Sequence, residues 1–308
     1  MNIGALIKSS GVRNFTKLLS ANVVAQVIGL VVYPILTRMY APEDFGLLNL
    51  FLSIGNVLVV LAIADYYYAI VLPKEEKDAV ALTHISLLFL LITTILVALS
   101  VLFSTPISMI FKSPNLAKYY LLMPLYVLIM GMWNVLNYWY IRKKSFGRIS
   151  GYQMSQSILS AGGKLGLGYA GVLQGGMIYA TVIAPFIALL SSLLLSFRKT
   201  LRPLLFFSKI DVLTQARVYR NFPCFVLPRS FINVLAGQLP VLLLTPFFGA
   251  KYVGLLSMAV LLAYTPIGTI SRAIYQVLYQ HTTECVHQSL PIKSMFRRFI
   301  GYTSVVII

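Results

Sequence analysis

Long apolar runs recur along the whole chain, and they restrict its fold more than any other feature. A helix needs about 20 mostly apolar residues to cross the hydrocarbon core of a bilayer. Only 11% of the residues are charged, whereas soluble domains average about 25%. We therefore predict an all-α fold, a polytopic transmembrane helix bundle. Full spans are expected at residues 16–37, 46–72, 82–111, 118–141, 151–172, 175–197, 221–248 and 252–279.

A further apolar run begins near Arg298 and continues to Ile308, which is about half the length of a span. A helix that ended there would leave carbonyl groups without partners in hydrocarbon. We therefore expect the sequence to be truncated at its C-terminal end. The 2 cysteines and 3 histidines show no disulfide or metal-binding spacing, so no metal site is expected.

Lysines and arginines gather on one side of the predicted bundle. Of the 25, 18 lie in the N-terminal arm and in the loops after the second, fourth, sixth and eighth spans, and 4 lie in the opposite loops. This asymmetry is typical of cytoplasmic loops, so the N-terminus is expected to be cytoplasmic. Topology and attraction to anionic lipids account for the net charge of +17, and no nucleic acid partner is expected.

The longest loop, at about 198–220, divides the spans into two groups. We predict a six-helix N-terminal lobe at residues 1–200 and an amphipathic cytoplasmic connector at 201–220. Residues 221–308 are expected to begin a C-terminal lobe, with two full helices and half of a third.

A short helix is predicted inside the connector. Ser208 and Asp211 have the spacing of a capping box, in which a side chain at the start of a helix accepts a backbone hydrogen bond. Phe206, Phe207, Ile210 and Leu213 would place this helix on the inner membrane surface.

The segment Gly166-x-Gly168-x-x-Gly171 matches the glycine pattern of dinucleotide-binding loops. That pattern requires a preceding strand, a following helix and an acidic residue about 20 positions later. Here it falls inside a predicted span, and the next carboxylate is Asp211. A nucleotide site is therefore not expected.

Carboxylates, which many enzymes use as acids or bases, are scarce. The chain has 8, namely Glu43, Asp44, Asp65, Glu75, Glu76, Asp78, Asp211 and Glu284. A membrane glycosyltransferase would need acidic residues on an outer loop. Only Glu43 and Asp44 are placed there, and Asp44 is equally well explained as a helix cap. We expect no enzymatic activity and no cofactor.

Charged residues inside predicted spans are the candidate functional residues, because a charge at the bilayer centre costs about 2.5–3.5 kcal/mol. Lys164 is expected close to mid-membrane, and Arg229 about 9 residues into its span, neither with an evident partner. Such cations suit an anionic ligand, for example a pyrophosphate. Asp65 and Arg272 are expected near the inner surface, where snorkelling or an ion pair explains them.

Small residues flank Lys164 at helical spacing. Gly162, Gly166 and Ala170 recur every four residues, which is typical of closely packed membrane helices. The aromatic segment at 133–144 is explained most simply as a belt at the membrane interface, with sugar stacking as the alternative.

Several segments, in order, resemble one family. They are PILTRMYAPEDFGLLNLFLSIGNVL (34–58), YYYAIVLPKEEKDAVAL (66–82), NYWYIRKKSFGRIS (137–150), LQGGMIYA (173–180) and, in 220–262, RNFPCF followed by LAGQLPVLLLTPFFGAKYVGLLSMAVLL. The chain resembles Wzx-type flippases, the O-antigen and polysaccharide branch of the MOP exporter superfamily, which has a MATE-like fold. The resemblance covers nearly the whole chain.

The resemblance implies two lobes around a central cavity in the bacterial inner membrane. It implies a flippase that moves undecaprenyl-diphosphate-linked oligosaccharides across that membrane by alternating access. Lys164 and Arg229 would bind the diphosphate, with Arg38 at the cavity rim and Asp65 as a proton or ion site. Membrane lipids and the lipid-linked oligosaccharide are the expected partners, and other polysaccharide-assembly membrane proteins are further candidates.

Other functions remain open at this point. A drug or cation antiporter of the same superfamily would need carboxylates inside the membrane, and only Asp65 qualifies. A membrane glycosyltransferase or polymerase would need an acidic outer loop. A scaffold that transports nothing is the third alternative.

Overall fold

The structure is a computed structural model that describes residues 27–206 and 208–287. The chain divides into two compact units, Met1–Ala259 and Val260–Ile308. In the second unit, the described residues continue the last helix of the first. The first span and the C-terminal half-span predicted from the sequence lie partly or wholly outside the described residues.

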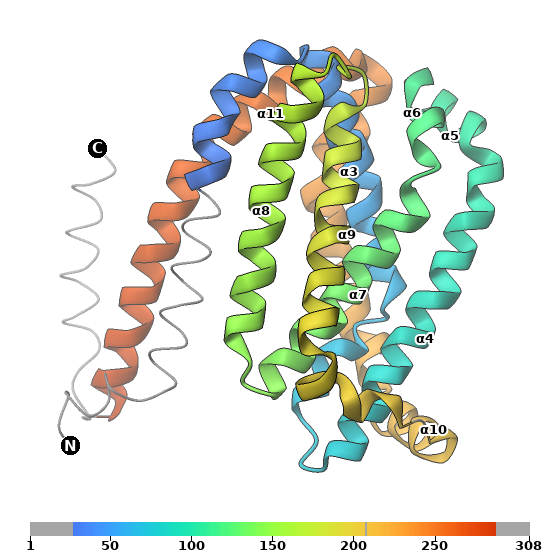
Figure 1. Ribbon diagram of the computed structural model, residues 1–308, viewed down its shortest axis with the longest axis vertical. Helices are drawn as coiled ribbons and strands as arrows, with labels where there is room; N and C mark the ends of the chain where they lie inside the picture. The colour runs from blue at the N-terminus through green and yellow to red at the C-terminus, as the bar shows by residue number, and fades with distance from the viewer. Residues whose placement is uncertain (1–26, 207, 288–308) are drawn as a thin grey trace. The chain divides into compact units, whose positions relative to one another are not determined.

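Helices and short connections make up all of the described chain, in which no strand occurs (Figure 1). The helix Val27–Met39 comes first. It is followed by α3 (Pro42–Ala62), η1 (Tyr66–Val71), α4 (Glu76–Ser100), η2 (Val101–Phe103), α5 (Ser104–Ile110), α6 (Pro114–Tyr120), α7 (Met123–Arg142), α8 (Phe146–Tyr169), α9 (Gly176–Ser196), η3 (Phe197–Leu201), η4 (Arg202–Leu205), α10 (Lys209–Val218), η5 (Phe222–Val226) and α11 (Leu227–His287).

The described helices include 4 that are long and apolar enough to cross a membrane: Pro42–Ala62, Glu76–Ile110, Gly176–Ser196 and Phe222–Leu261. Helices α6 and α7, bent by 56°, make a fifth if they act as one span. The prediction of an all-α polytopic membrane bundle is confirmed. Helix α8 does not reach this hydropathy, because it carries polar residues such as Gln153, Gln156 and Lys164.

Two boundaries show how the backbone sets the ends of the helices. Apolar residues continue to Leu72, but α3 already ends at Ala62, because Ala64 and Asp65 adopt positive φ angles of 46° and 55°. Within α11 only Gly249 leaves the helical region, at φ 81°. That break falls between the spans predicted at 221–248 and 252–279.

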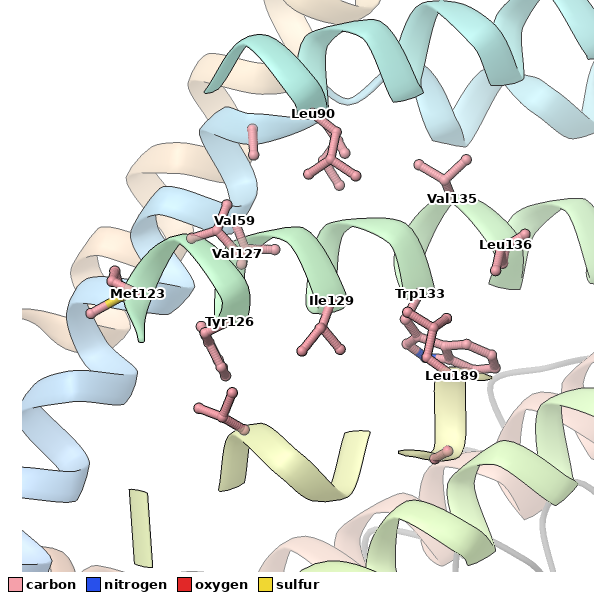
Figure 2. Close-up of a cluster of buried hydrophobic side chains, with 14 of the residues drawn as sticks. Val59, Leu90, Met123, Tyr126, Val127, Ile129, Trp133, Val135, Leu136 and Leu189 are labelled. Atoms are coloured by element: carbon pink, nitrogen blue, oxygen red, sulfur yellow. The ribbon is translucent and has the colours of Figure 1, made fainter. Parts of the chain in front are cut away.

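Helix α7 lies in the middle of the N-terminal helices and packs against α3, α4, α8 and α9. Figure 2 shows its buried side chains beside Val59 of α3, Leu90 of α4 and Leu189 of α9. Two glycines permit close contacts of this helix with its neighbours: the ring of Tyr126 lies over Gly55, and Leu90 lies over Gly131. These contacts form the core of the bundle.

The loops of the first unit gather at two ends. We call one of them the basic end. There the Arg142 guanidinium donates a 2.7 Å hydrogen bond to the Pro73 carbonyl, and Trp139 Nε1 donates a 2.9 Å hydrogen bond to the Thr200 carbonyl. At the other end, the opposite end, Tyr119 packs on Gly175 and Lys251 lies 4.0 Å from Glu43. The loops after the second, fourth and sixth predicted spans, which the charge pattern grouped together, therefore lie together in the described part of the chain.

Both predicted helix caps are present. The Ala41 backbone N–H donates to Asp44 Oδ2 at 3.1 Å at the start of α3. The Asp211 backbone N–H donates to Ser208 Oγ at 3.4 Å at the start of α10. The short helix predicted in the connector therefore begins where the capping box indicated.

Candidate functional site

Lys164 lies in the last third of α8 and is half-buried. Its backbone carbonyl accepts a 2.7 Å hydrogen bond from the Tyr40 hydroxyl. No described residue makes an ion pair or hydrogen bond with its ammonium group. An anion brought to Lys164 would therefore meet a lysine that no described carboxylate neutralises.

The depth of Lys164 differs from the sequence-based expectation. The residue is 5 positions before Tyr169, where α8 ends. At a rise of 1.5 Å per residue, the Lys164 backbone lies about 7.5 Å from the C-terminal end of α8, at Tyr169, rather than halfway along the helix. The difference arises because α8 begins and ends earlier than the apolar run at 151–172.

Arg38 is exposed, one residue before the end of the helix Val27–Met39. The next two residues, Met39 and Tyr40, pack on Gly168 of α8. Arg38 thus belongs to the same end of the bundle as Lys164.

Asp65 lies between α3 and η1, near the basic end, and is only 1% exposed. Ser230 of α11 donates a hydrogen bond to its carboxylate, and the charge of Arg229 also acts on it. Burial raises the pKa of Asp65, and Ser230 and Arg229 partly offset that rise. Asp65 Oδ2 is buried and has no hydrogen-bond partner among the described residues.

This arrangement corrects the expectation that Arg229 has no counter-charge. The exposed Arg229 side chain lies near a buried carboxylate that is far away in sequence. Sequence spacing could not show this, because Asp65, which follows α3, and Ser230 of α11 are 165 positions apart in the chain. Helices α3 and α11 also contact each other where Ser53 Oγ donates a 2.8 Å hydrogen bond to Gln238 Oε1.

The two cationic positions are far apart. Tyr40, which contacts Lys164, precedes α3, and Asp65, beside Arg229, follows it. Helix α3 has 21 residues, so the two positions are separated by roughly 30 Å along the bundle. Lys164 and Arg229 cannot hold the same diphosphate in this conformation.

The small-residue stripe has no described neighbour. A Cβ added at Gly162 or Gly166 would meet no described atom within 4 Å, and Ala170 is the exposed C-cap of α8. Close packing is instead made by Gly163, against Ala180, and by Gly168, against Met39 and Tyr40. The predicted packing role of the stripe therefore stays a prediction.

The aromatic segment is not an interfacial belt. Trp139 and Tyr140 are 0% exposed, and each bonds to the chain: Trp139 to the Thr200 carbonyl and Tyr140 to Ser192. Trp133 stacks on Tyr152. These rings fill the core, so neither a lipid belt nor sugar stacking explains Trp139 and Tyr140.

Among the described residues, no group of three or more His, Cys, Asp or Glu side chains is placed to hold a metal ion. The charged groups singled out from the sequence are the half-buried Lys164 near the opposite end and, near the basic end, the exposed Arg229 beside the buried Asp65. These features define a polytopic α-helical membrane protein with charged groups inside its bundle.

Comparison with known families gives a match over most of the chain. The model of the polysaccharide biosynthesis protein family matches residues 35–308, and the chain belongs to this family. No curated protein and no solved structure matches the chain significantly.

Proposed function

We propose that the protein is a flippase that moves undecaprenyl-diphosphate-linked oligosaccharides across the bacterial inner membrane by alternating access. The half-buried Lys164 ammonium, which has no anionic partner among the described residues, is the observation that carries this proposal. A cation held in such a place suits a diphosphate, which offers several acceptor oxygens. Membership of the polysaccharide biosynthesis family supports the same substrate class.

The separation of the cationic positions suggests that they act in succession. Arg229, near the basic end, would meet the diphosphate first if that end faces the cytoplasm. Lys164, about 30 Å away, would hold it later, near the opposite end. Asp65 would compete with the diphosphate for Arg229, so that the substrate is released as the carboxylate regains its counter-charge.

The alternatives receive less support. An antiporter for cations would need acidic groups facing a cavity, and Asp65 is the acidic group that the described structure buries inside the bundle. In an enzyme, Glu43 and Asp44 would be the outer acidic pair, but Asp44 caps α3 and Glu43 lies beside Lys251. A transporter therefore accounts for more of the charged groups than an enzyme.

Replacing Lys164 tests the proposal. In the protein's own cells, Lys164→Met should lower surface polysaccharide by about tenfold or more, the effect of losing one charge-assisted hydrogen bond. Lipid-linked oligosaccharide should accumulate at the same time, which is measured by mass spectrometry of extracted lipids. Lys164→Arg should keep most of the export.

The matched control is Lys118→Met, which removes an exposed lysine from the same end of the bundle. Protein levels in the membrane must be equal for all variants. If Lys164→Met exports as much polysaccharide as Lys118→Met, Lys164 does not bind the substrate. If no variant accumulates lipid-linked oligosaccharide, the proposed substrate class is wrong.

A further inference from the structure

A pocket of about 410 Å³ lies at the basic end, apart from Lys164. The first two turns of α4, the η4 segment and the first turn of α10 form its walls. Its polar lining includes Glu76, Lys77 and Asp211, and its apolar lining includes Val80 and Phe206. The proposed transport mechanism gives this pocket no role.

Two charged groups of the pocket, Asp211 and Lys77, are available to a ligand. Asp211 is half-buried and makes no ion pair with a described residue. Its place in the first turn of α10 favours its negative charge, because the amino end of a helix is partially positive. Lys77 pairs with Glu75 at 3.0 Å, but both side chains are more than 60% exposed, so the pair stabilises little and can open.

Glu76 gives the pocket a second carboxylate. Its Oε1 lies 2.7 Å from the ammonium of Lys143, the residue after α7; the Lys143 side chain is 27% exposed and that of Glu76 is 51% exposed. The charge of Asp211 acts on Lys77. The described lining of the pocket therefore includes two carboxylates, one ammonium and the imidazole of His84, whose Nε2 lies 2.9 Å from the Leu204 carbonyl oxygen.

Apolar side chains beside the pocket face outward. Phe206, Ile210 and Leu213 are 73%, 77% and 62% exposed. Exposed apolar side chains next to charged ones are typical of segments at a membrane interface. On that placement, the pocket would open among the lipid headgroups.

We infer that this pocket binds the headgroup of a zwitterionic phospholipid with a primary amine. The lipid ammonium would be held by Asp211 and Glu76, and its phosphate by Lys77. Its chains would lie along Phe206. An anionic headgroup without an amine would leave the two carboxylates facing it, and a quaternary ammonium could not donate hydrogen bonds to them. This inference is independent of the flippase proposal.

Native mass spectrometry tests the inference. The full chain is released from nanodiscs that contain equal amounts of phosphatidylethanolamine, phosphatidylglycerol and phosphatidylcholine. Phosphatidylethanolamine should remain bound preferentially. Asp211→Asn should reduce its retention by roughly tenfold, as expected for one charge-assisted hydrogen bond. The cap of α10 persists in this variant, since the cap uses the backbone N–H of residue 211.

Two further variants complete the test. Glu43→Gln, which removes a carboxylate at the opposite end, should leave retention unchanged. Lys77→Gln should lower it, and because Lys77 is exposed this variant is expected to fold even if Asp211→Asn does not. Equal retention of the three lipids, or equal behaviour of Asp211→Asn and Glu43→Gln, overturns the inference. Displacement by free phosphoethanolamine at lipid-equivalent concentration overturns the assignment to a lipid.

Discussion

At the scale of single residues, two glycines of the same helix face different surroundings. A Cβ at Gly168 would lie 2.6 Å from Met39 Cε and 3.1 Å from a ring carbon of Tyr40, whereas one at Gly162 meets no described atom within 4 Å. The Tyr40 hydroxyl also bonds to Lys164. Gly168 therefore controls how closely the helix Val27–Met39 approaches α8.

We predict that Gly168→Ala lowers the thermal stability of the purified protein, because Met39 and Tyr40 must move. Gly162→Ala should be neutral or stabilising by up to about 1 kcal/mol, since alanine favours helix more than glycine does. Thermal unfolding in detergent measures both variants. Equal melting temperatures for the two would show that Gly168 is not a close-packing position.

Residue roles were predictable where the cause is local. The caps at Asp44 and Ser208 depend on residues three positions apart, so the sequence shows them. The burial of Trp139 and the pairing of Asp65 with Ser230 depend on distant elements. An aromatic residue near basic residues has the same local pattern in a core as at a membrane interface.

At the scale of elements, Arg142 ties the end of α7 to the segment before α4. Its guanidinium donates to the carbonyls of Ile70 and Pro73 through one nitrogen, and to those of Lys74 and Glu75 through the other. The Ile70 carbonyl lies inside η1, and those of Pro73, Lys74 and Glu75 lie in the connection between η1 and α4. The side chain thus completes the hydrogen bonding of a non-helical connection.

We predict that Arg142→Gln destabilises the protein by about 2 kcal/mol, because hydrogen bonds from a charged donor contribute about 1.5–3 kcal/mol and some of these are exposed. Arg142→Lys should be intermediate, since an ammonium cannot serve four carbonyls as a planar guanidinium does. Lys74→Gln, at a neighbouring exposed lysine, is the control. Thermal unfolding of the three variants is the measurement. If Arg142→Lys is as stable as the unchanged protein, the positive charge is sufficient and the planar guanidinium is not required.

Helix boundaries were the weakest predictions at this scale. Hydropathy continues past Ala62, but positive φ angles at Ala64 and Asp65 end α3. The position of Lys164 along its helix also differs from the one expected from the apolar run at 151–172, because α8 begins at Phe146 and ends at Tyr169; its depth in the membrane stays a prediction. The break at Gly249 was easier to predict, because Lys251 interrupts the apolar run there.

At the scale of the whole molecule, the charge pattern grouped the loops after the second, fourth and sixth predicted spans at one end, and the described structure places these loops together. Which end faces the cytoplasm is a separate prediction. We expect the basic end to do so, because lysine and arginine are retained on the cytoplasmic side.

Cysteine labelling in intact spheroplasts checks this orientation. In a background without Cys224 and Cys285, Lys112→Cys should react with a membrane-impermeant maleimide. Lys144→Cys should react only after the membrane is permeabilised, because it lies at the basic end. The reverse pattern would show that the basic end faces outward, and would also exclude the proposed order of Arg229 before Lys164.

The distance between the two cationic positions has an electrical consequence. Under the proposed function, a diphosphate that moves from Arg229 to Lys164 carries its negative charge across most of the membrane's field. With the inside negative, each such charge gains about 2.3 kcal/mol per 100 mV on its way outward. The membrane voltage alone would then favour export over return, and dissipating it would slow the outward step even with every contact of the protein intact.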